Sequence, residues 1–197
     1  MRYLSRQQVE ETGISMAEMI AAVEAMFRDK GHGRVEMPPK PGIHTRPDAF
    51  IHAMPAYIPG AGAAGMKWIS GYPSNQARGL PYISGLMILN DEETGIPVAV
   101  MDATWLTAMR TGAATAVAAK YLARASSRRV GILACGVQGR SNLIALAEQF
   151  ELETVRAFDV DGEAARSYAH DMSDKTYPRC AGSLRSDALH DSRCDFS

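Results

Sequence analysis

Cysteine is scarce in this sequence, long apolar runs are missing, and neither sign of charge predominates. The three cysteines, Cys135, Cys180 and Cys194, are odd in number and widely spaced, so no disulfide framework is indicated. Cys180, His190 and Cys194 fit no zinc-binding spacing, and we therefore expect no bound metal. No apolar run approaches the ~20 residues that cross a bilayer, and the first residues lack the apolar core of a signal peptide. These absences predict a cytoplasmic protein without membrane association.

The charge pattern excludes a polyanionic partner. Lys and Arg number 21 against 22 Asp and Glu, which gives a formal net charge of -1. There is no basic block and no interleaving of basic with aromatic residues, so we expect no nucleic-acid partner. With 197 residues, of which 46% are hydrophobic, the chain is long enough for one large or two small globular domains.

The first part of the chain has the pattern of an α+β domain. Ser15 and Glu18 form a capping-box pattern, and apolar residues behind them recur every three or four positions, which predicts a helix ending near Lys30. The proline-rich stretch 36–47 predicts no regular structure. Short apolar segments follow, separated by Pro and Gly turns, and predict an antiparallel or mixed sheet with strands at 50–54, 65–70, 82–90 and 97–101.

The periodicity changes at Thr104, where an Ala-rich helix begins. Gly112 within it is unfavourable for a helix, so we expect another backbone to approach there. A polar linker, "ASSRR", follows the helix. After it, the pattern strand (129–134), helix (138–150), strand (154–159), helix (162–172) predicts a parallel, doubly wound sheet. The fold class is therefore α/β, with domains at 1–124 and 125–197.

The turn between the first of these strands and its helix resembles a dinucleotide-binding fingerprint. That fingerprint is G-x-G-x-x-G, and its three positions are here Ala134, Gly136 and Gly139. A glycine at the second position lets a pyrophosphate approach the backbone, and one at the third lets the helix pack on the strand. The amides of Val137 and Gln138 begin the helix and suit an anion. The alternative is a plain turn between a strand and a helix.

An acidic residue at the end of the next strand strengthens this interpretation. Asp159 follows Gly136 at about the ~20-residue distance typical of the fingerprint. Its carboxylate can accept hydrogen bonds from ribose hydroxyls and would repel a 2′-phosphate, which favours NAD over NADP.

Two cations stand in apolar surroundings. Strand alternation places Lys67 on the face opposite Met66 and Trp68, where it either meets solvent or enters a pocket. Arg110 interrupts a neutral helix and is either a surface residue or a group that binds a carboxylate or phosphate. The residues alone leave both alternatives open.

Several segments together resemble the ornithine cyclodeaminase/mu-crystallin family. In order they are "MPPK", "HAMPAY", "GMKWISGYPSN", "GLPYISGLMILNDEETGIPVAVMDAT", "TAMRTGAATAVAAKYLAR" and "ACGVQ". The similarity covers residues 5 to 172, and "MPPK" with "LMILN" and "AVMDAT" is similar to the archaeal-type NAD-dependent alanine dehydrogenases of that family.

The resemblance implies roles for individual residues. Lys67 matches the lysine that binds the substrate carboxylate and exchanges protons in catalysis, and Arg110 matches an arginine that grips the carboxylate beside the nicotinamide. Lys40 stands where cyclodeaminases have a carboxylate-binding arginine. The residues implied to line the dinucleotide are Arg110, Thr111, Gly136, Val137, Gln138, Asp159, Val160 and Asp161. Family members form homodimers through their N-terminal sheets.

Three departures from the family bear on function. Cyclodeaminases have an acidic residue where this chain has His52, which argues against ornithine as substrate, and Ala134 replaces a glycine. The chain is also shorter than family members and stops where a third strand of the nucleotide sheet is expected to begin, so we interpret it as a fragment or a truncated product.

The expected function is NAD-dependent oxidation and reduction of a small L-amino acid or its imine, as in alanine dehydrogenase. The alternatives are an ornithine cyclodeaminase, a cyclic imine reductase, or a non-catalytic binding protein for small ligands of the mu-crystallin type.

Overall fold

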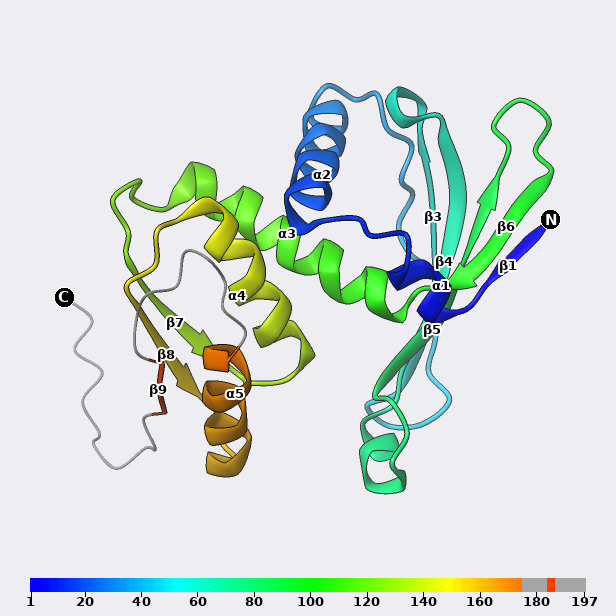
Figure 1. The fold of residues 1–197 in the computed structure, drawn as a ribbon. Helices are drawn as coiled ribbons and strands as arrows, with labels where there is room; N and C mark the ends of the chain where they lie inside the picture. Colours follow the sequence, from blue (N-terminus) through cyan, green and yellow to red (C-terminus); the bar gives the residue numbers. More distant parts are fainter. Residues whose placement is uncertain (175–183, 187–197) are drawn as a thin grey trace. The chain divides into compact units, whose positions relative to one another are not determined.

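The chain divides into two compact units in its computed structural model, which describes residues 1–174 and 184–186 (Figure 1). The units are Met1–Thr107 and Ala108–Ser197, so the division falls inside helix α3 (Thr104–Leu122). The sequence instead placed the domain boundary after this helix, between residues 124 and 125. Cys180, His190 and Cys194 lie outside the described residues.

The first unit is built on a six-stranded sheet with the order β1-β6-β5-β4-β3-β2. Strand β1 pairs in parallel with β6 and every other pair is antiparallel, which confirms the expected mixed sheet. The elements in chain order are β1 (Arg2–Leu4), α1 (Arg6–Glu10), α2 (Met16–Gly31), β2 (Gly42–Ile43), β3 (Phe50–Ile58), η1 (Pro59–Ala61), β4 (Ala63–Gly71), η2 (Pro73–Arg78), β5 (Ile83–Asn90) and β6 (Pro97–Asp102).

Local signals correctly predict α2, the long helix of this unit. At the start of α2 the Ser15 side chain accepts from the Glu18 amide at 3.2 Å, while the Glu18 carboxylate accepts from the Ser15 amide at 2.9 Å. This capping box satisfies two amide groups that have no partner inside the helix. Among the helices that the structure describes, none has the length and apolar character needed to cross a membrane.

The sequence analysis did not predict β2 and β1, the two edge strands of the sheet. The proline-rich stretch contains the short strand β2, in which Gly42 pairs with His52 and Ile43 with Ile51. Both β2 residues can donate to a ladder, unlike the prolines around them, so the prediction of no regular structure was wrong at this dipeptide. Strand β1 has too few residues for its alternation to be recognised.

The second unit contains a parallel sheet with the order β7-β8-β9. Its elements after α3 are β7 (Arg129–Leu133), α4 (Val137–Gln149), β8 (Thr154–Phe158), α5 (Gly162–Asp174) and β9 (Leu184–Ser186). The predicted alternation of strand and helix is confirmed. The expectation that a third strand begins only where the chain stops was wrong, because β9 already pairs with β8 at Leu184–Ser186.

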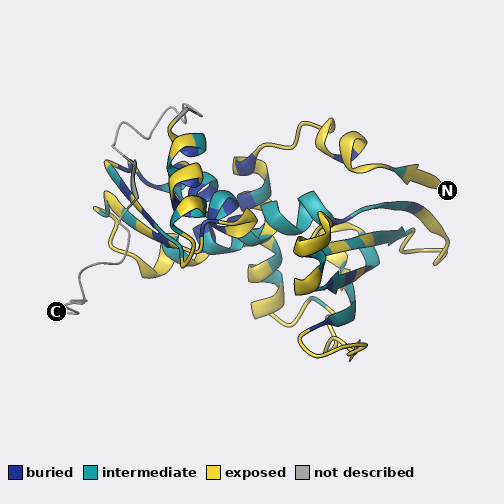
Figure 2. Ribbon diagram, turned by 90° about the horizontal axis from the view of Figure 1, so that it is seen from below, coloured by how far each residue is buried: buried dark blue, intermediate teal, exposed yellow. Residues whose placement is uncertain are grey.

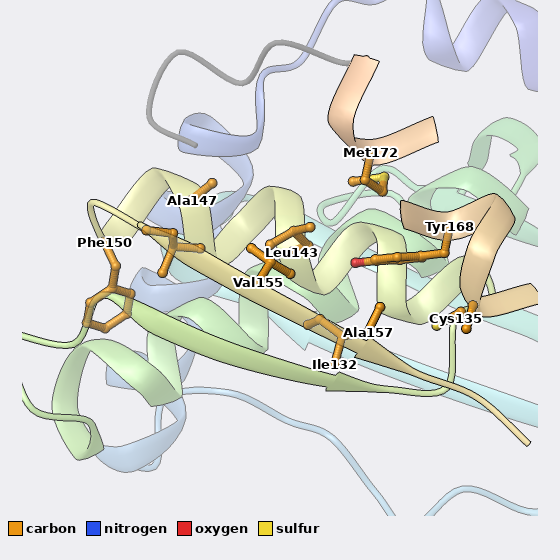
Figure 3. Close-up of a cluster of buried hydrophobic side chains, with 11 residues drawn as sticks. Ile132, Cys135, Leu143, Ala147, Phe150, Val155, Ala157, Tyr168 and Met172 are labelled. Atoms are coloured by element: carbon orange, nitrogen blue, oxygen red, sulfur yellow. The ribbon is translucent and has the colours of Figure 1, made fainter. Parts of the chain in front are cut away.

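One cluster of buried apolar side chains joins the sheet of the second unit to α4 and α5. Figure 2 shows buried segments, in dark blue, along the ribbon of this unit. It includes Ile132 and Val155 from the strands and Leu143, Tyr168 and Met172 from α4 and α5 (Figure 3). The fully buried Tyr168 donates its hydroxyl proton to the Gly139 carbonyl oxygen at 3.1 Å. The first turn of α4 is therefore held by α5 as well as by β7.

The later part of α3 packs against α4, which explains why the second unit begins inside α3. A Cβ at Gly112 would lie 2.3 Å from the Ser141 carbonyl oxygen, so only glycine allows this approach. Three residues on, Thr115 donates to the Asn142 side-chain oxygen at 3.1 Å. The expected close approach at Gly112 is confirmed.

Replacement of Gly112 by Ala should therefore destabilise the protein by about 1–3 kcal/mol, because a backbone oxygen must move to make room. Urea unfolding checks this. Gly131→Ala is the matched control, since a Cβ there meets no atom within 4 Å, and it should be neutral or slightly stabilising. Equal stability of the two variants would contradict the packing of α3 on α4.

Candidate functional site

The turn between β7 and α4 leaves the first amides of the helix without a side-chain cap among the residues that the structure describes. Gly136 is the N-terminal cap residue of α4 and offers no side chain to accept from them. The amides of Val137 and Gln138 therefore point out of the helix at the positive end of its dipole, an arrangement that suits an anionic ligand.

The two glycines of the turn differ in what surrounds them. A Cβ at Gly139 would lie 2.3 Å from the Ala134 carbonyl oxygen, so the packing of α4 on the end of β7 requires glycine. A Cβ at Gly136 would meet no protein atom within 4 Å, and its φ of -76° suits any residue. Protein packing does not account for Gly136, whereas a pyrophosphate placed against the backbone would.

Ala134 is held in the left-handed region, with φ 73°. That conformation costs a residue with a Cβ about 1–2 kcal/mol, and it is the reason for glycine at this position of the fingerprint. Alanine in place of glycine at position 134 therefore introduces local backbone strain, but the backbone still follows the path of the fingerprint turn.

Asp159 connects the ends of the two strands. Its Oδ2 accepts from the Cys135 amide at 2.7 Å, and its Oδ1 accepts from the Asp161 amide at 3.0 Å. These donors, the Cys135 amide first, hold the pKa of the Asp159 carboxyl below its ordinary value. The carboxylate is thus ionised at neutral pH, and each of its two oxygens accepts from a backbone amide.

The neighbours of Asp159 flank the same edge of the sheet. Val160 is 97% exposed and Val137 is 67% exposed, so two apolar side chains meet solvent at the carboxyl ends of the strands. Asp161 accepts from the Glu163 amide at 2.9 Å and so caps α5. Ligands of open parallel sheets bind outside this edge, and the structure brings the predicted residues of the second unit's turn together there.

Lys67 is the buried cation of the first unit. Its residue exposure is 9%, while that of the adjacent Trp68 is 43%, which confirms the predicted alternation. On the buried face Lys67 is paired across the sheet with Met54 and Met87. Its Nζ donates to the Thr107 hydroxyl at 3.5 Å. A buried ammonium group is stabilised by a bound anion, so Lys67 is suited to bind a carboxylate.

Apart from the family resemblance, nothing in the sequence marks Lys40 or His52 as functional residues. In the structure the charge of Lys40 acts on the His52 ring. The His52 ring stacks on Phe50 at 4.4 Å between centroids and meets the His44 ring edge-on at 6.4 Å. Loss of hydration lowers the pKa of His52, and the positive charges of Lys40 and His44 lower it further. His52 is therefore neutral at pH 7, next to the exposed cation Lys40.

Arg110 lies on α3 in the second unit, as does Thr111, whereas Lys40 and Lys67 belong to the first. Its side chain is exposed and has no acidic partner among the described residues of its own unit. Neighbouring atoms nevertheless remove part of the water around its guanidinium, which lowers the pKa of this group, and the guanidinium stays charged at neutral pH.

A hollow in the first unit was not foreseen from the sequence. It has a volume of about 680 Å³, and its lining includes Arg46, Asp48, Tyr72 and Arg78 but none of the predicted site residues. Within the described parts of the chain, no group of three His, Cys, Asp or Glu side chains is placed to hold a metal ion.

The sequence is similar to those of several known proteins. The sequence profile of the ornithine cyclodeaminase/mu-crystallin family matches residues 2–189. Alanine dehydrogenase of Archaeoglobus fulgidus is 44% identical over 172 residues, which are 87% of this chain and 52% of that protein. The nodulation efficiency protein NfeD of Rhizobium meliloti is 43% identical over 174 residues, or 88% of this chain and 54% of that protein. The chain thus spans about half the length of these relatives.

Two solved structures have the same fold over most of this chain. One is Δ1-pyrroline-2-carboxylate reductase of Thermococcus litoralis in complex with NADH and L-proline, with TM-score 0.89 and 38% identity, covering 95% of this chain and 57% of the other. The other is an archaeal alanine dehydrogenase dimer with bound NAD, with TM-score 0.87 and 41% identity, covering 95% and 56%.

Replacement of Ala134 by Gly should stabilise the protein by roughly 1 kcal/mol, because glycine adopts a positive φ without strain. Thermal unfolding measures the gain. Ala118→Gly, at an exposed position of α3, is the control and should lose about 1 kcal/mol. Destabilisation by both changes would mean that Ala134 is not left-handed.

Proposed function

The chain belongs to the ornithine cyclodeaminase/mu-crystallin family, and on this premise we propose that the whole protein is an NAD-dependent oxidoreductase of a small L-amino acid or the corresponding imine. The observation that carries the proposal is the free helix N-terminus behind Gly136 together with Asp159, at the sheet edge where dinucleotides bind. The similar structures whose titles name NAD or NADH support it.

The second unit supplies the groups that fit the dinucleotide. The amides of Val137 and Gln138 would bind the pyrophosphate, and the carboxylate oxygens of Asp159 would bind ribose hydroxyls. The negative charge of Asp159 disfavours a 2′-phosphate, so we expect NAD rather than NADP. The exposed Val160 and the adjacent Asp161 complete the lining. Bound NAD would supply the hydride chemistry.

Three cations are assigned to the substrate in this proposal. Lys67, Lys40 and Arg110 would bind the carboxylate, and Thr111 would line the nicotinamide side of the dinucleotide. A fixed carboxylate holds the α-carbon in position for reaction, which is catalysis by orientation. Lys67 is also assigned the proton exchange, because a lysine with few water molecules around it readily changes protonation state.

The substrate class is a small amino acid without a cationic side chain. His52 is neutral and is influenced by the positive charge of Lys40, so this position offers an uncharged imidazole where a second ammonium group would need a carboxylate. We therefore favour alanine over ornithine. The cyclic imine pyrroline-2-carboxylate is the second candidate, because the structure with TM-score 0.89 is a reductase of that compound.

The outer face of the first unit's sheet supports a homodimer. Trp68 and Leu86 lie opposite each other on β4 and β5, and they are 43% and 49% exposed. Neighbouring apolar side chains exposed on a sheet are typical of a protein interface. The similar archaeal alanine dehydrogenase is a dimer, and we propose that a second copy of this chain covers the face. A cytoplasmic location remains part of the same proposal.

Substrate screening of the whole protein tests the function. With NAD and alanine, absorbance at the NADH wavelength should rise, whereas ornithine should give no product. Reduction of pyrroline-2-carboxylate with NADH, without reaction of alanine, would identify the imine reductase instead. NADH binding without turnover of any of these compounds would overturn the enzymatic proposal and indicate a binding protein.

Lys67→Met should lower kcat/KM for alanine by roughly 10²–10⁴-fold, since it removes the carboxylate contact and the proton carrier together. NADH affinity, measured by fluorescence titration, should stay within twofold. Lys30→Met, at an exposed position near the end of α2, is the control and should keep full activity. Full activity of the Lys67 variant would refute the assigned role.

Trp68→Glu should weaken the dimer at least about 30-fold, because it places a charge in the proposed apolar interface. Light scattering coupled to gel filtration measures the mass of the particle. Leu122→Glu, at an 85% exposed position of α3, is the control and should leave the dimer intact. A dimer that survives Trp68→Glu at low concentration would place the interface elsewhere.

A further inference from the structure

Both peptide planes that flank Ala134 are fixed by the end of strand β8. The Ala134 amide donates to the Phe158 carbonyl oxygen at 2.8 Å, which orients the plane before the residue. The Cys135 amide donates to the Asp159 carboxylate at 2.7 Å, which orients the plane after it. Because φ and ψ of a residue are set by the planes on its two sides, these bonds together determine the conformation of Ala134.

That conformation needs support, because Ala134 has a positive φ of 73°. A glycine would adopt it without penalty, whereas an alanine returns to negative φ unless its neighbours prevent this. A hydrogen bond from an amide to an ionised carboxylate is stronger than one between neutral groups. The bond to Asp159 is therefore the stronger of the two that hold the residue.

We propose that Asp159 is a positioning residue, whose carboxylate holds the turn between β7 and α4 in its binding shape before any ligand arrives. The turn leads directly to Gly136 and to the free amides of Val137 and Gln138. Asp159 thereby sets the direction of these amides, in addition to the ribose contact proposed above. The ligand-free role of Asp159 is independent of the proposed function, and only its consequence for NADH affinity rests on it.

The chemistry of the carboxylate is specific. Its two oxygens each accept a backbone amide, from Cys135 and from Asp161. An asparagine has one acceptor atom and one donor atom at these places, so one amide would face an N–H group. Asp159→Asn thus keeps the size of the side chain. It either breaks the bond to the Cys135 amide or replaces it by a weaker bond to a neutral acceptor.

Hydrogen exchange of the ligand-free protein tests the proposal. In Asp159→Asn the amides of Ala134 and Cys135, which are hydrogen-bonded in the wild type, should exchange about tenfold faster. Glu163→Gln removes a nearby exposed charge and is the control, which should leave the exchange of these amides unchanged. Unchanged exchange in Asp159→Asn would overturn the proposal.

A second background separates positioning from general damage. With glycine at 134 the turn no longer needs the carboxylate, so in Ala134→Gly the effect of Asp159→Asn on exchange should fall to threefold or less. The same tenfold effect in both backgrounds would show that Asp159 does not act on Ala134. NADH titration of the wild type decides separately on the proposed function: absence of binding would refute that function and leave the exchange result intact.

The pH dependence adds a readout that mere side-chain packing would not move. The Cys135 amide holds the pKa of Asp159 below its ordinary value, so the carboxylate stabilises the turn above the unfolded pKa of about 3.9. This contribution is lost as pH falls through the lower folded value. The exchange difference between wild type and Asp159→Asn should persist from pH 7 to 5 and shrink below about pH 4. The ionisable groups beside Asp159 are Cys135, Arg140 and Asp161, and the Asp161 side chain caps α5 by accepting from the Glu163 amide.

Discussion

The packing of α3, α4 and β7 in the second unit depends on two glycines, at each of which two backbone segments lie unusually close together. Gly112 lets α3 meet the carbonyl of Ser141 on α4, and Gly139 lets α4 meet the carbonyl of Ala134 at the end of β7. A Cβ at either position would overlap a backbone oxygen, which cannot move without shifting a helix or a strand. These contacts fix where α4 begins, and the free amides at its start depend on that position.

In the first unit the corresponding constraint is the alternation of β4. Because successive side chains point to opposite faces, the strand that presents Trp68 outward must bury Lys67. A single strand thus separates the face proposed for dimer formation from the cation proposed for the substrate carboxylate. A one-residue slip of register would exchange the two, so the long pairing of β4 with β3 and β5 protects both roles.

Family membership and the geometry of the turn are independent observations, and both support the proposal of NAD-dependent chemistry. The similarity to solved structures with bound NADH or NAD covers 95% of this chain and 57% or 56% of the other chains. The geometry adds reasons internal to this chain: Gly136 has open space on its Cα, and the ionised Asp159 lies at the carboxyl end of β8. The role of Asp159 in the turn also explains how the chain tolerates alanine where the fingerprint has glycine.

Local patterns in the sequence determined the helices, the parallel strand-helix alternation and the glycine-rich turn. Capping at Ser15, the apolar periodicity of α2 and the fingerprint positions involve neighbours along the chain, so they can be recognised without a fold. The alternatives left open for Lys67 could be settled only by the sheet, which decides which face of β4 is covered. The hydrogen bond between Cys135 and Asp159 and the relation of Lys40 to His52 join residues distant in sequence, and no periodicity encodes them. Tertiary structure decided these features because they depend on which strands become neighbours, and that is a property of the folded chain as a whole.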